Sequence, residues 1–230
     1  MRIAVISDIH GNMNALEAVM EDIDNENCEK VLVLGDYAMA GPEPSLVVDW
    51  LFKKQFDPKF SMIQGNTDLM IANFSDELYE NLKTKAPIMS EALRNDVKLF
   101  NPILTNFLKS LPIQLEVEEG GVKFLLVHGS PRRINEDIMP DTPISEVEQM
   151  LQNVKADVVL CGHTHLPCGF QTSTKQTVVN VGSVGRPFTE EPKSCYLKIT
   201  VNDLDIVNLN GIKSYAESGV FVTGDVIKTL

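Results

Sequence analysis

Short apolar runs recur along the chain, and most are bounded by glycine or by aspartate, asparagine and histidine. Runs of this length and composition are typical of buried β-strands. They predict strands at residues 2–7, 30–34, 59–63, 122–127 and 157–161. Apolar residues at helical spacing predict helices at about 12–26 and from Pro44 to about residue 54. The strand–helix–strand order favours βαβ units and a partly parallel sheet.

The pattern changes twice after the third strand. From about 69 to 111 apolar residues recur helically without a strand-like run, which predicts a helical insertion between core strands. We favour helices that pack on the core over a cap that shapes substrate access. From residue 113 strands dominate, at 113–118, 122–127, 168–172, 176–181, 194–200 and 204–209, with one helix near 144–154. Residues 211–230 give no strong prediction. The whole pattern predicts two packed sheets with helices outside.

Composition narrows the class of protein. The 230 residues are 43% hydrophobic, which suits one globular domain over residues 1–230. A net charge of −12 lacks the basic surface of a non-specific nucleic-acid binder. No apolar stretch approaches the roughly 20 residues that cross a bilayer, and four cysteines without a CxxC pair fit a reducing compartment. We therefore expect a cytoplasmic protein without membrane or non-specific nucleic-acid partners.

Polar residues capable of binding metal follow five of the apolar runs. The set uses every histidine in the chain: Asp8, His10, Asp36, Asn66, His128, His163 and His165. Ligands of open α/β sheets bind at the carboxyl ends of strands, so these side chains are expected to meet at one rim. A lone histidine after a strand is more often a packed residue than a ligand, but five such pieces in order favour a metal site.

The residue types indicate which metals would bind. Asp8 and His10 are two apart, as are His163 and His165, and at a strand end that spacing points both side chains the same way. Asp36 offers two oxygens that can bridge two metals. Mixed imidazole and carboxylate ligands favour manganese, iron, cobalt, nickel or zinc over magnesium and calcium, and manganese is our first expectation. The set contains no cysteine, which argues against a structural zinc site.

These motifs resemble the five blocks of the calcineurin-like metallophosphoesterases, in particular the small bacterial and archaeal phosphodiesterase type. The blocks are Asp8-Ile9-His10-Gly11-Asn12, Gly35-Asp36, Gly65-Asn66-Thr67-Asp68, Val127-His128-Gly129 and Gly162-His163-Thr164-His165. Residues 180–185 are similar to the closing loop of those small members. The resemblance implies an α/β fold, a four-layer αββα sandwich of two mixed sheets flanked by helices. It also implies a dinuclear metal site that hydrolyses phosphate esters or anhydrides.

The resemblance assigns roles residue by residue. It implies that Asp8, His10 and His165 hold one metal, that Asn66, His128 and His163 hold the other, and that Asp36 bridges them. It also implies catalytic roles for Asp36, Asn66, Asp68 and His128. The chemistry agrees, because two metals about 3.5–4 Å apart lower the pKa of a shared water. The resulting bridging hydroxide would attack phosphorus in line, without a covalent protein intermediate. Asn12 and Asn180 would order the ligands through hydrogen bonds.

Thr67 departs from the family pattern. Many members carry a histidine at this position, which protonates the leaving group and is oriented by the next acidic residue, here Asp68. Threonine does not act as an acid near neutral pH. We therefore expect cleavage of phosphodiesters or phosphoanhydrides, with nucleotides and dinucleoside polyphosphates as candidate substrates, rather than of alkyl monoesters. Capping of a helix N-terminus is an alternative role for Thr67 and Asp68 that is compatible with this one.

Three arginines are candidate contacts to the substrate phosphate. Arg132 and Arg133 follow the His128 loop, and Arg186 follows the Gly182–Gly185 loop. Arginine suits bidentate recognition of phosphate. The alternative, an ion pair with one of the many acidic residues, carries equal weight for each of the three.

Two other functions fit the same fold. A protein serine/threonine phosphatase is disfavoured by Thr67 and by the short chain. A non-catalytic protein-binding scaffold, like a eukaryotic coat subunit with this fold, has no chemical need for all seven candidate ligands. The expected partner is a small phosphate-containing substrate, and the sequence leaves the oligomeric state open, a homo-oligomer included.

Overall fold

The structure is a computed structural model, and it describes residues 1–188, 193–201, 208–210, 212–215, 220–223 and 226–229. The predicted βαβ units are confirmed at its N-terminal end. The elements follow as β1 (Arg2–Ile6), α1 (Met13–Asn25), β2 (Lys30–Val33), α2 (Pro44–Lys54) and β3 (Phe60–Met62). The three strands are parallel. Antiparallel β10 (Leu197–Thr200) and β11 (Asn208–Asn210) extend this sheet beyond β1, which makes it a mixed sheet.

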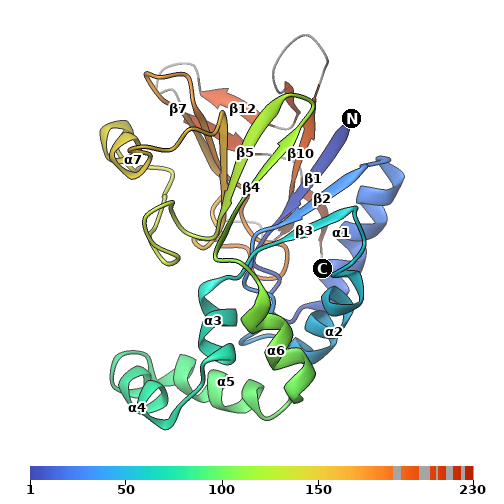
Figure 1. Cartoon of the computed structure of the whole chain (residues 1–230), viewed down its shortest axis with the longest axis vertical. Helices are drawn as coiled ribbons and strands as arrows, with labels where there is room; N and C mark the ends of the chain where they lie inside the picture. The colour runs from blue at the N-terminus through green and yellow to red at the C-terminus, as the bar shows by residue number, and fades with distance from the viewer. Residues whose placement is uncertain (189–192, 202–207, 211, 216–219, 224–225, 230) are drawn as a thin grey trace.

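A second mixed sheet packs against the first. Its strand order is β12 (Ile212–Tyr215), β13 (Val220–Thr223), β7 (Cys168–Gln171), β8 (Thr177–Asn180), β6 (Val158–Cys161), β5 (Val122–Val127) and β4 (Gln114–Glu119). β5, β6 and β8 are parallel, and β4 and β5, which match the strands predicted at 113–118 and 122–127, form a hairpin. In Figure 1, α7 (Ile144–Met150) lies outside this sheet and α1 and α2 lie outside the other. The predicted arrangement of two mixed sheets flanked by helices is confirmed.

Strand alternation produces three apolar layers. On β1, Ile3 and Val5 belong to the cluster between the sheets, whereas Ala4 and Ile6 belong to the cluster that includes α1 and α2. β5 alternates in the same way between the inter-sheet cluster and the cluster beneath α7. Because successive side chains of a strand point to opposite faces, an all-apolar run is buried on both sides. The continuous apolar runs of the sequence therefore correspond to central strands.

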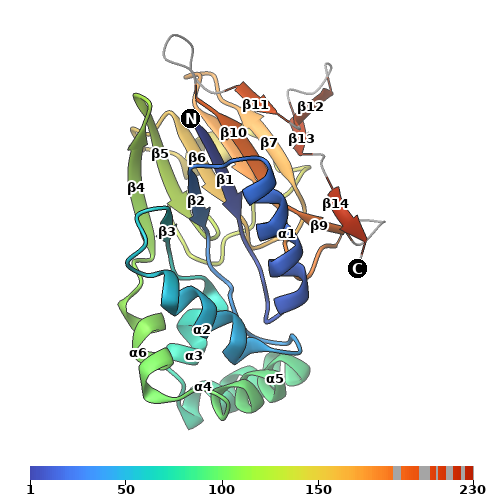
Figure 2. The same cartoon turned by 90° about the vertical axis from the view of Figure 1, so that its right-hand side faces the viewer.

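The helical segment consists of four helices: α3 (Asn66–Ala72), α4 (Asp76–Lys85), α5 (Pro87–Val97) and α6 (Pro102–Ser110). It begins at Asn66, earlier than the expected residue 69. Figures 1 and 2 show these helices at one end of the molecule, beyond the ends of β1, β2 and β3. α6 packs on the core through Leu104, Phe107 and Leu108. Among the described residues no helix has the length and apolar composition that crossing a bilayer requires.

The late strands require one correction. The single strand expected at 194–200 is interrupted at Tyr196, so β9 (Lys193–Cys195) and β10 are separate. β9 pairs with β14 (Val226–Thr229) and β10 pairs with β1, and Figure 2 shows β9 and β14 beside α1. Of the strand expected at 204–209, residues 204–207 lie outside the described part, and 208–210 form β11.

Candidate metal centre

The candidate ligands meet where the parallel strands end. We call the set Asp8, His10, Asp36, Asn66, His128, His163 and His165 the ligand rim. Backbone hydrogen bonds join the loops that carry it: the N–H groups of Asp8 and His10 donate to the carbonyls of Gly35 and Asp36, both at 3.0 Å. The Gly162 N–H donates to the His128 carbonyl at 2.8 Å, which joins the loops after β5 and β6. The Gly185 N–H donates to the Asp8 carbonyl at 3.0 Å, which joins the loops of the two sheets through main-chain contacts.

The rim backbone is unusual, and it corrects our reason for expecting paired side chains. β1 ends at Ile6 and β6 ends at Cys161, so neither histidine pair continues a strand. Left-handed φ angles occur instead at five rim residues: Asp8 (55°), His10 (49°), Asp36 (54°), His163 (69°) and His165 (61°). This conformation costs a non-glycine residue about 1–2 kcal/mol. Such strain persists only where surrounding contacts fix it, and it clusters at functional sites.

Two glycines allow the loops to approach the carboxylates. A Cβ on Gly65 would lie 2.2 Å from Oδ1 of Asp36, and a Cβ on Gly162 would lie 2.4 Å from Oδ2 of Asp8. Neither distance is compatible with a side chain. The glycines that mark these motifs in the sequence therefore serve close packing around the two aspartates.

Three histidines are oriented by backbone carbonyls. Their Nδ1 atoms donate as follows: His10 to Met39 at 3.1 Å, His128 to Leu34 at 2.8 Å and His165 to Arg186 at 2.6 Å. A carbonyl only accepts, so the neutral ring carries its proton on Nδ1 and an unshared pair on Nε2. This second hydrogen bond fixes the tautomer and the orientation that a metal-binding histidine needs.

The first group of candidate ligands is Asp8, His10 and His165, all buried. The Nε2 atoms of His10 and His165 lie 3.0 Å apart. Oδ1 of Asp8 lies 3.2 Å from Nε2 of His165 and 3.7 Å from Nε2 of His10. Three acceptor atoms therefore surround one point.

The second group is Asp36, His128 and His163. Nε2 of His128 lies 3.3 Å from Oδ1 of Asp36, and Nε2 of His10 lies 3.7 Å from its Oδ2. The two carboxylate oxygens of Asp36 thus face different groups. Asn66, the first residue of α3, lies beside this group, because the next N–H, that of Thr67, donates to Oδ1 of Asp36 at 2.9 Å.

Electrostatics show how strongly the rim attracts positive charge. Burial alone would raise the pKa of Asp8 and of Asp36, but nearby histidines, His128 first, hold both pKa values below the ordinary range. Burial alone would lower the pKa of His128, but Asp36 and Asp8 raise this pKa to about 10. The buried carboxylates of Asp8 and Asp36 therefore favour positive charge at this rim.

The residues fit divalent metal ions. Oδ1 of Asp8, Oδ1 of Asn66 and Nε2 of His128 are buried without a hydrogen-bond partner. Buried polar atoms without partners are costly, and a cation would satisfy the two oxygens and bind the imidazole nitrogen once its proton is displaced. The donor set is imidazole, carboxylate and amide oxygen, which suits divalent transition metals.

Thr67 and Asp68 face inward. The Thr67 hydroxyl donates to the Ala38 carbonyl at 3.1 Å. Asp68 accepts backbone N–H groups from Asp36, Tyr37 and Gly65 at 2.8–3.0 Å. Burial raises the pKa of Asp68 to about 7, and the charge of Asp36 acts in the same direction. Both Asp68 oxygens are engaged with the backbone, so we interpret Asp68 as a positioning residue for the Asp36 loop.

The three arginines separate into two kinds. Arg132 and Arg133 both form ion pairs with buried Glu136, at 2.7 and 2.6 Å. This geometry favours the ion-pair interpretation for these two. Arg186 is exposed and lines a cavity together with His10, and its contact to a substrate phosphate stays a prediction.

Asp137 and Phe188 were missed by the sequence reasoning. Oδ1 of Asp137 lies 3.3 Å from Nε2 of His163, and the Phe188 ring stacks on His165 with centroids 4.5 Å apart. An exposed aspartate and phenylalanine in loops carry no sequence signal. Asn180 behaves as expected, because its amide donates to the Gly162 carbonyl at 2.7 Å and to Oγ1 of Thr164 at 2.9 Å. Asn12 caps α1 and also donates to the Gly185 carbonyl at 3.1 Å.

Fold and centre together define the class of metallophosphoesterases. A model of the calcineurin-like phosphoesterase superfamily domain matches residues 1–203. The chain therefore belongs to the calcineurin-like phosphoesterase superfamily, as its motifs predicted.

Individual relatives extend over most of the chain. An uncharacterized protein of Methanocaldococcus jannaschii is 29% identical over 227 residues, covering 89% of this chain and 84% of its own. A hypothetical protein from Pyrococcus horikoshii is similar in structure with a TM-score of 0.80 and 25% identity, covering 90% and 86% of the two chains. A metallophosphoesterase from Sphaerobacter thermophilus has a TM-score of 0.71 at 24% identity, with 91% and 86% covered, which shows the shared fold.

Proposed function

We propose that this protein is a phosphoesterase with a dinuclear metal centre that hydrolyses phosphodiester or phosphoanhydride bonds. The observation that carries the proposal is the position of Asp36, whose two oxygens face His128 and His10 in different ligand groups. In this proposal Asp8, His10 and His165 hold one metal. Asn66, His128 and His163 hold the other, and Asp36 contacts both.

Two bound metals lower the pKa of a water molecule and stabilise the charge that develops on a phosphoryl group. The residues of the chain orient the groups that would bind the metals. Backbone carbonyls fix His10, His128 and His165, and the Asp68 carboxylate fixes the Asp36 loop. Manganese is the metal we propose first, because imidazole and carboxylate ligands occur together.

Thr67 supports a preference among leaving groups. Its hydroxyl already donates to Ala38, and the four histidines of the chain all belong to the ligand rim. We therefore propose that the leaving group departs without a proton from the protein. Aryl alcohols and nucleotide phosphates depart readily as anions, whereas alkyl alcohols do not.

A hydrolysis panel with the manganese-loaded protein tests the proposal. It compares bis(p-nitrophenyl) phosphate, a dinucleoside polyphosphate and an alkyl phosphomonoester. We expect the first two to be hydrolysed and the alkyl ester to be hydrolysed slowest. No turnover of any of the three would contradict the proposal.

The variant Thr67→His refines this test. A histidine here would supply the missing acid, so the rate should rise mainly for the alkyl ester. General acid catalysis contributes about 10²–10⁴-fold where it operates. An equal change for all substrates would refute the leaving-group argument and leave the phosphoesterase proposal intact.

A further inference from the structure

A cavity of about 410 Å³ opens directly beside the ligand rim. On one side it is lined by His10 and Thr67, with Arg186 also contributing. On the other side lies the N-terminal half of α5, through Pro87, Ile88, Met89 and Ala92. We call these four residues the α5 wall. The cavity thus connects the metal centre with the helical segment, and its volume lies in the range of small-molecule sites, about 300–1,000 Å³.

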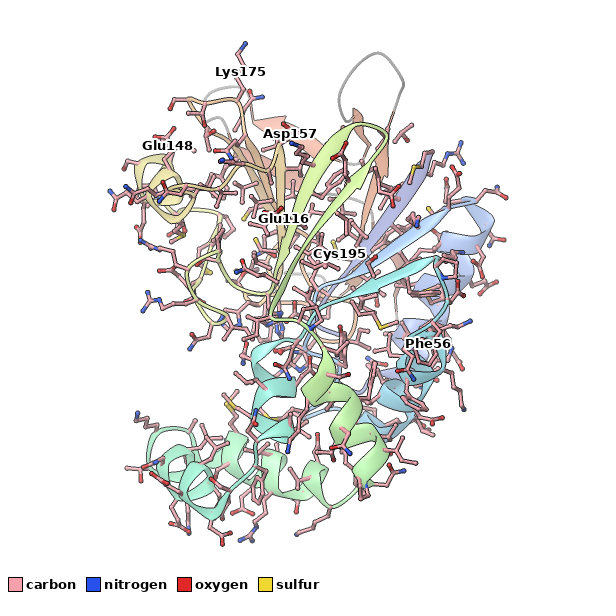
Figure 3. All side chains as sticks on the ribbon, in the orientation of Figure 1. Phe56, Glu116, Glu148, Asp157, Lys175 and Cys195 are labelled. Carbon is pink, nitrogen blue, oxygen red and sulfur yellow. The ribbon has the colours of Figure 1, made fainter. Side chains whose placement is uncertain are left out.

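The cavity surface is mainly hydrocarbon and thioether. Met39 and Ala40 of the loop after β2, together with Ala86, complete the apolar lining. Ile88 is 88% exposed, which is extreme for isoleucine, although it lies next to a charged centre. Phe56, labelled in Figure 3, is equally exposed, but it follows α2 and lines none of the described cavities. The apolar surface at Ile88 thus lies at a concave site next to the ligand rim.

The polar features of the cavity are few and suit an aromatic phosphoester. The guanidinium of Arg186 lies 5.5 Å from the Phe188 ring centroid, and Phe188 stacks on His165. A guanidinium suits both an anionic phosphate and the face of a ring. Thr67 lines the cavity while its N–H donates to Oδ1 of Asp36. A phosphate at the rim can therefore extend a substituent along Thr67 towards the α5 wall.

We propose that this cavity binds the organic part of the substrate, and that this part is a flat aromatic ring such as a nucleobase or an aryl group. The proposal rests on the phosphoesterase function above and specifies its substrate class. A hydrophilic alcohol or inorganic phosphate would leave Ile88 and Met89 in water. A ring covers them and gains the free energy of apolar burial.

Kinetics on two kinds of substrate test this selectivity. Bis(p-nitrophenyl) phosphate and a dinucleoside polyphosphate carry rings, whereas inorganic tripolyphosphate carries none. Ile88→Gln removes apolar surface at a site too exposed to affect folding, and Ala92→Phe fills the cavity. We expect both variants to raise KM for the ring-bearing substrates about tenfold, since one lost apolar contact is worth about 10–200-fold. The kcat/KM for tripolyphosphate should change less than about twofold by the same reasoning.

Ile103→Gln is the matched control. Ile103 is an exposed isoleucine of α6, 60% exposed, and it does not line the cavity. This variant should behave as the wild type with every substrate. The proposal is overturned if Ile88→Gln and Ala92→Phe slow tripolyphosphate and aryl substrates equally, or if neither variant affects either.

A binding measurement separates this proposal from the proposed function. Equilibrium dialysis compares phenylphosphonate with methylphosphonate, neither of which is hydrolysed. The wild type should bind the phenyl compound about tenfold more tightly, and Ile88→Gln should reduce that preference. Equal affinities would refute the aromatic site even if hydrolysis is observed. A phenyl preference without any hydrolysis would instead refute the proposed function alone.

Discussion

The ligand rim and the α5 wall lie side by side but are built on different principles. The rim is made of loops whose backbones take left-handed conformations and whose histidines are fixed by carbonyls. The wall is the start of a regular helix, with Pro87 in its first turn and Ile88 exposed. The rim is held by many polar contacts, whereas the wall presents exposed Pro87 and Ile88 and packs on the core only through Met89 and Ala92.

This difference assigns the metal chemistry to the rim and the choice of substrate to the α5 wall. Metal chemistry requires several atoms held at fixed positions, so each rim residue depends on its neighbours. A pocket wall only has to be apolar and of suitable shape. Changes at the rim should therefore affect every substrate and the fold itself, whereas changes at the wall should affect only the choice of substrate.

The largest effect is expected for Asp36→Asn. The amide keeps the shape of the side chain but removes the charge that faces both ligand groups. The kcat/KM should fall for all substrates by more than the about 100-fold that changes outside the ligand set cause. Steady-state kinetics with bis(p-nitrophenyl) phosphate and with tripolyphosphate measure it.

Asp49→Asn is the control, because Asp49 lies on α2 in an exposed pair with Lys53. It should keep wild-type rates. A selective loss of only one substrate in Asp36→Asn would contradict the division between rim and wall.

Adding a methyl group should distinguish the two regions in stability. A Cβ at Gly162 would lie 2.1 Å from Oγ of Ser7 and 2.4 Å from Oδ2 of Asp8. Gly162→Ala should therefore destabilise the protein by about 1–3 kcal/mol, the cost of overpacking. Ala92→Val, a larger addition in the α5 wall, should cost less than about 1 kcal/mol. Urea unfolding of the metal-free variants measures both. Equal losses of unfolding free energy in Gly162→Ala and Ala92→Val would contradict the proposed difference between rim and wall.

The smallest expected effect is on stability and concerns Glu136. This residue precedes Asp137, whose carboxylate lies near His163. The guanidinium of Arg132, with help from Ser130 and Arg133, lowers the pKa of Glu136 to about 2. Its folded pKa lies below the unfolded value near 4.5, so its stabilisation is present above that pH and is lost as pH falls towards 2. Glu136→Gln should cost about 1 kcal/mol at pH 7, because the arginines are partly solvated.

Unfolding free energies between pH 3 and pH 7 measure the Glu136 effect, with Glu17→Gln on the exposed face of α1 as control. The difference between wild type and Glu136→Gln should shrink as pH falls. A difference that is constant with pH would contradict the assigned ion pairs.

The sequence pattern indicated that the rim residues would lie close together, because their residue types are rare in that pattern. Histidine, aspartate and asparagine after apolar runs have few structural explanations when all occur together. The hydrogen bonds that orient the histidines could not be predicted from the sequence. Their acceptors are backbone carbonyls of Leu34, Met39 and Arg186, and any residue type can supply a carbonyl. The left-handed angles at Asp8 and His163 were also invisible, since non-glycine residues seldom adopt them.

The wall and the last strands were harder to predict for a different reason. Pro87, Ile88 and Met89 form an ordinary helix start, and apolar helix positions predict core packing as readily as a pocket. The break at Tyr196 depends on β9 pairing with β14, a strand about thirty residues later. The local sequence at 194–200 predicts one unbroken strand, because it contains no information about which distant strands pair with each half.

The central claim is that Asp36 joins two metals in one rim. Electron paramagnetic resonance during titration of the metal-free protein with Mn²⁺ tests it most directly, because bridged manganese ions couple magnetically and isolated ions do not. We expect saturation at about two ions per chain with a coupled signal, and loss of coupling in Asp36→Asn. Saturation at a single ion, or two ions with only uncoupled signals, would contradict it.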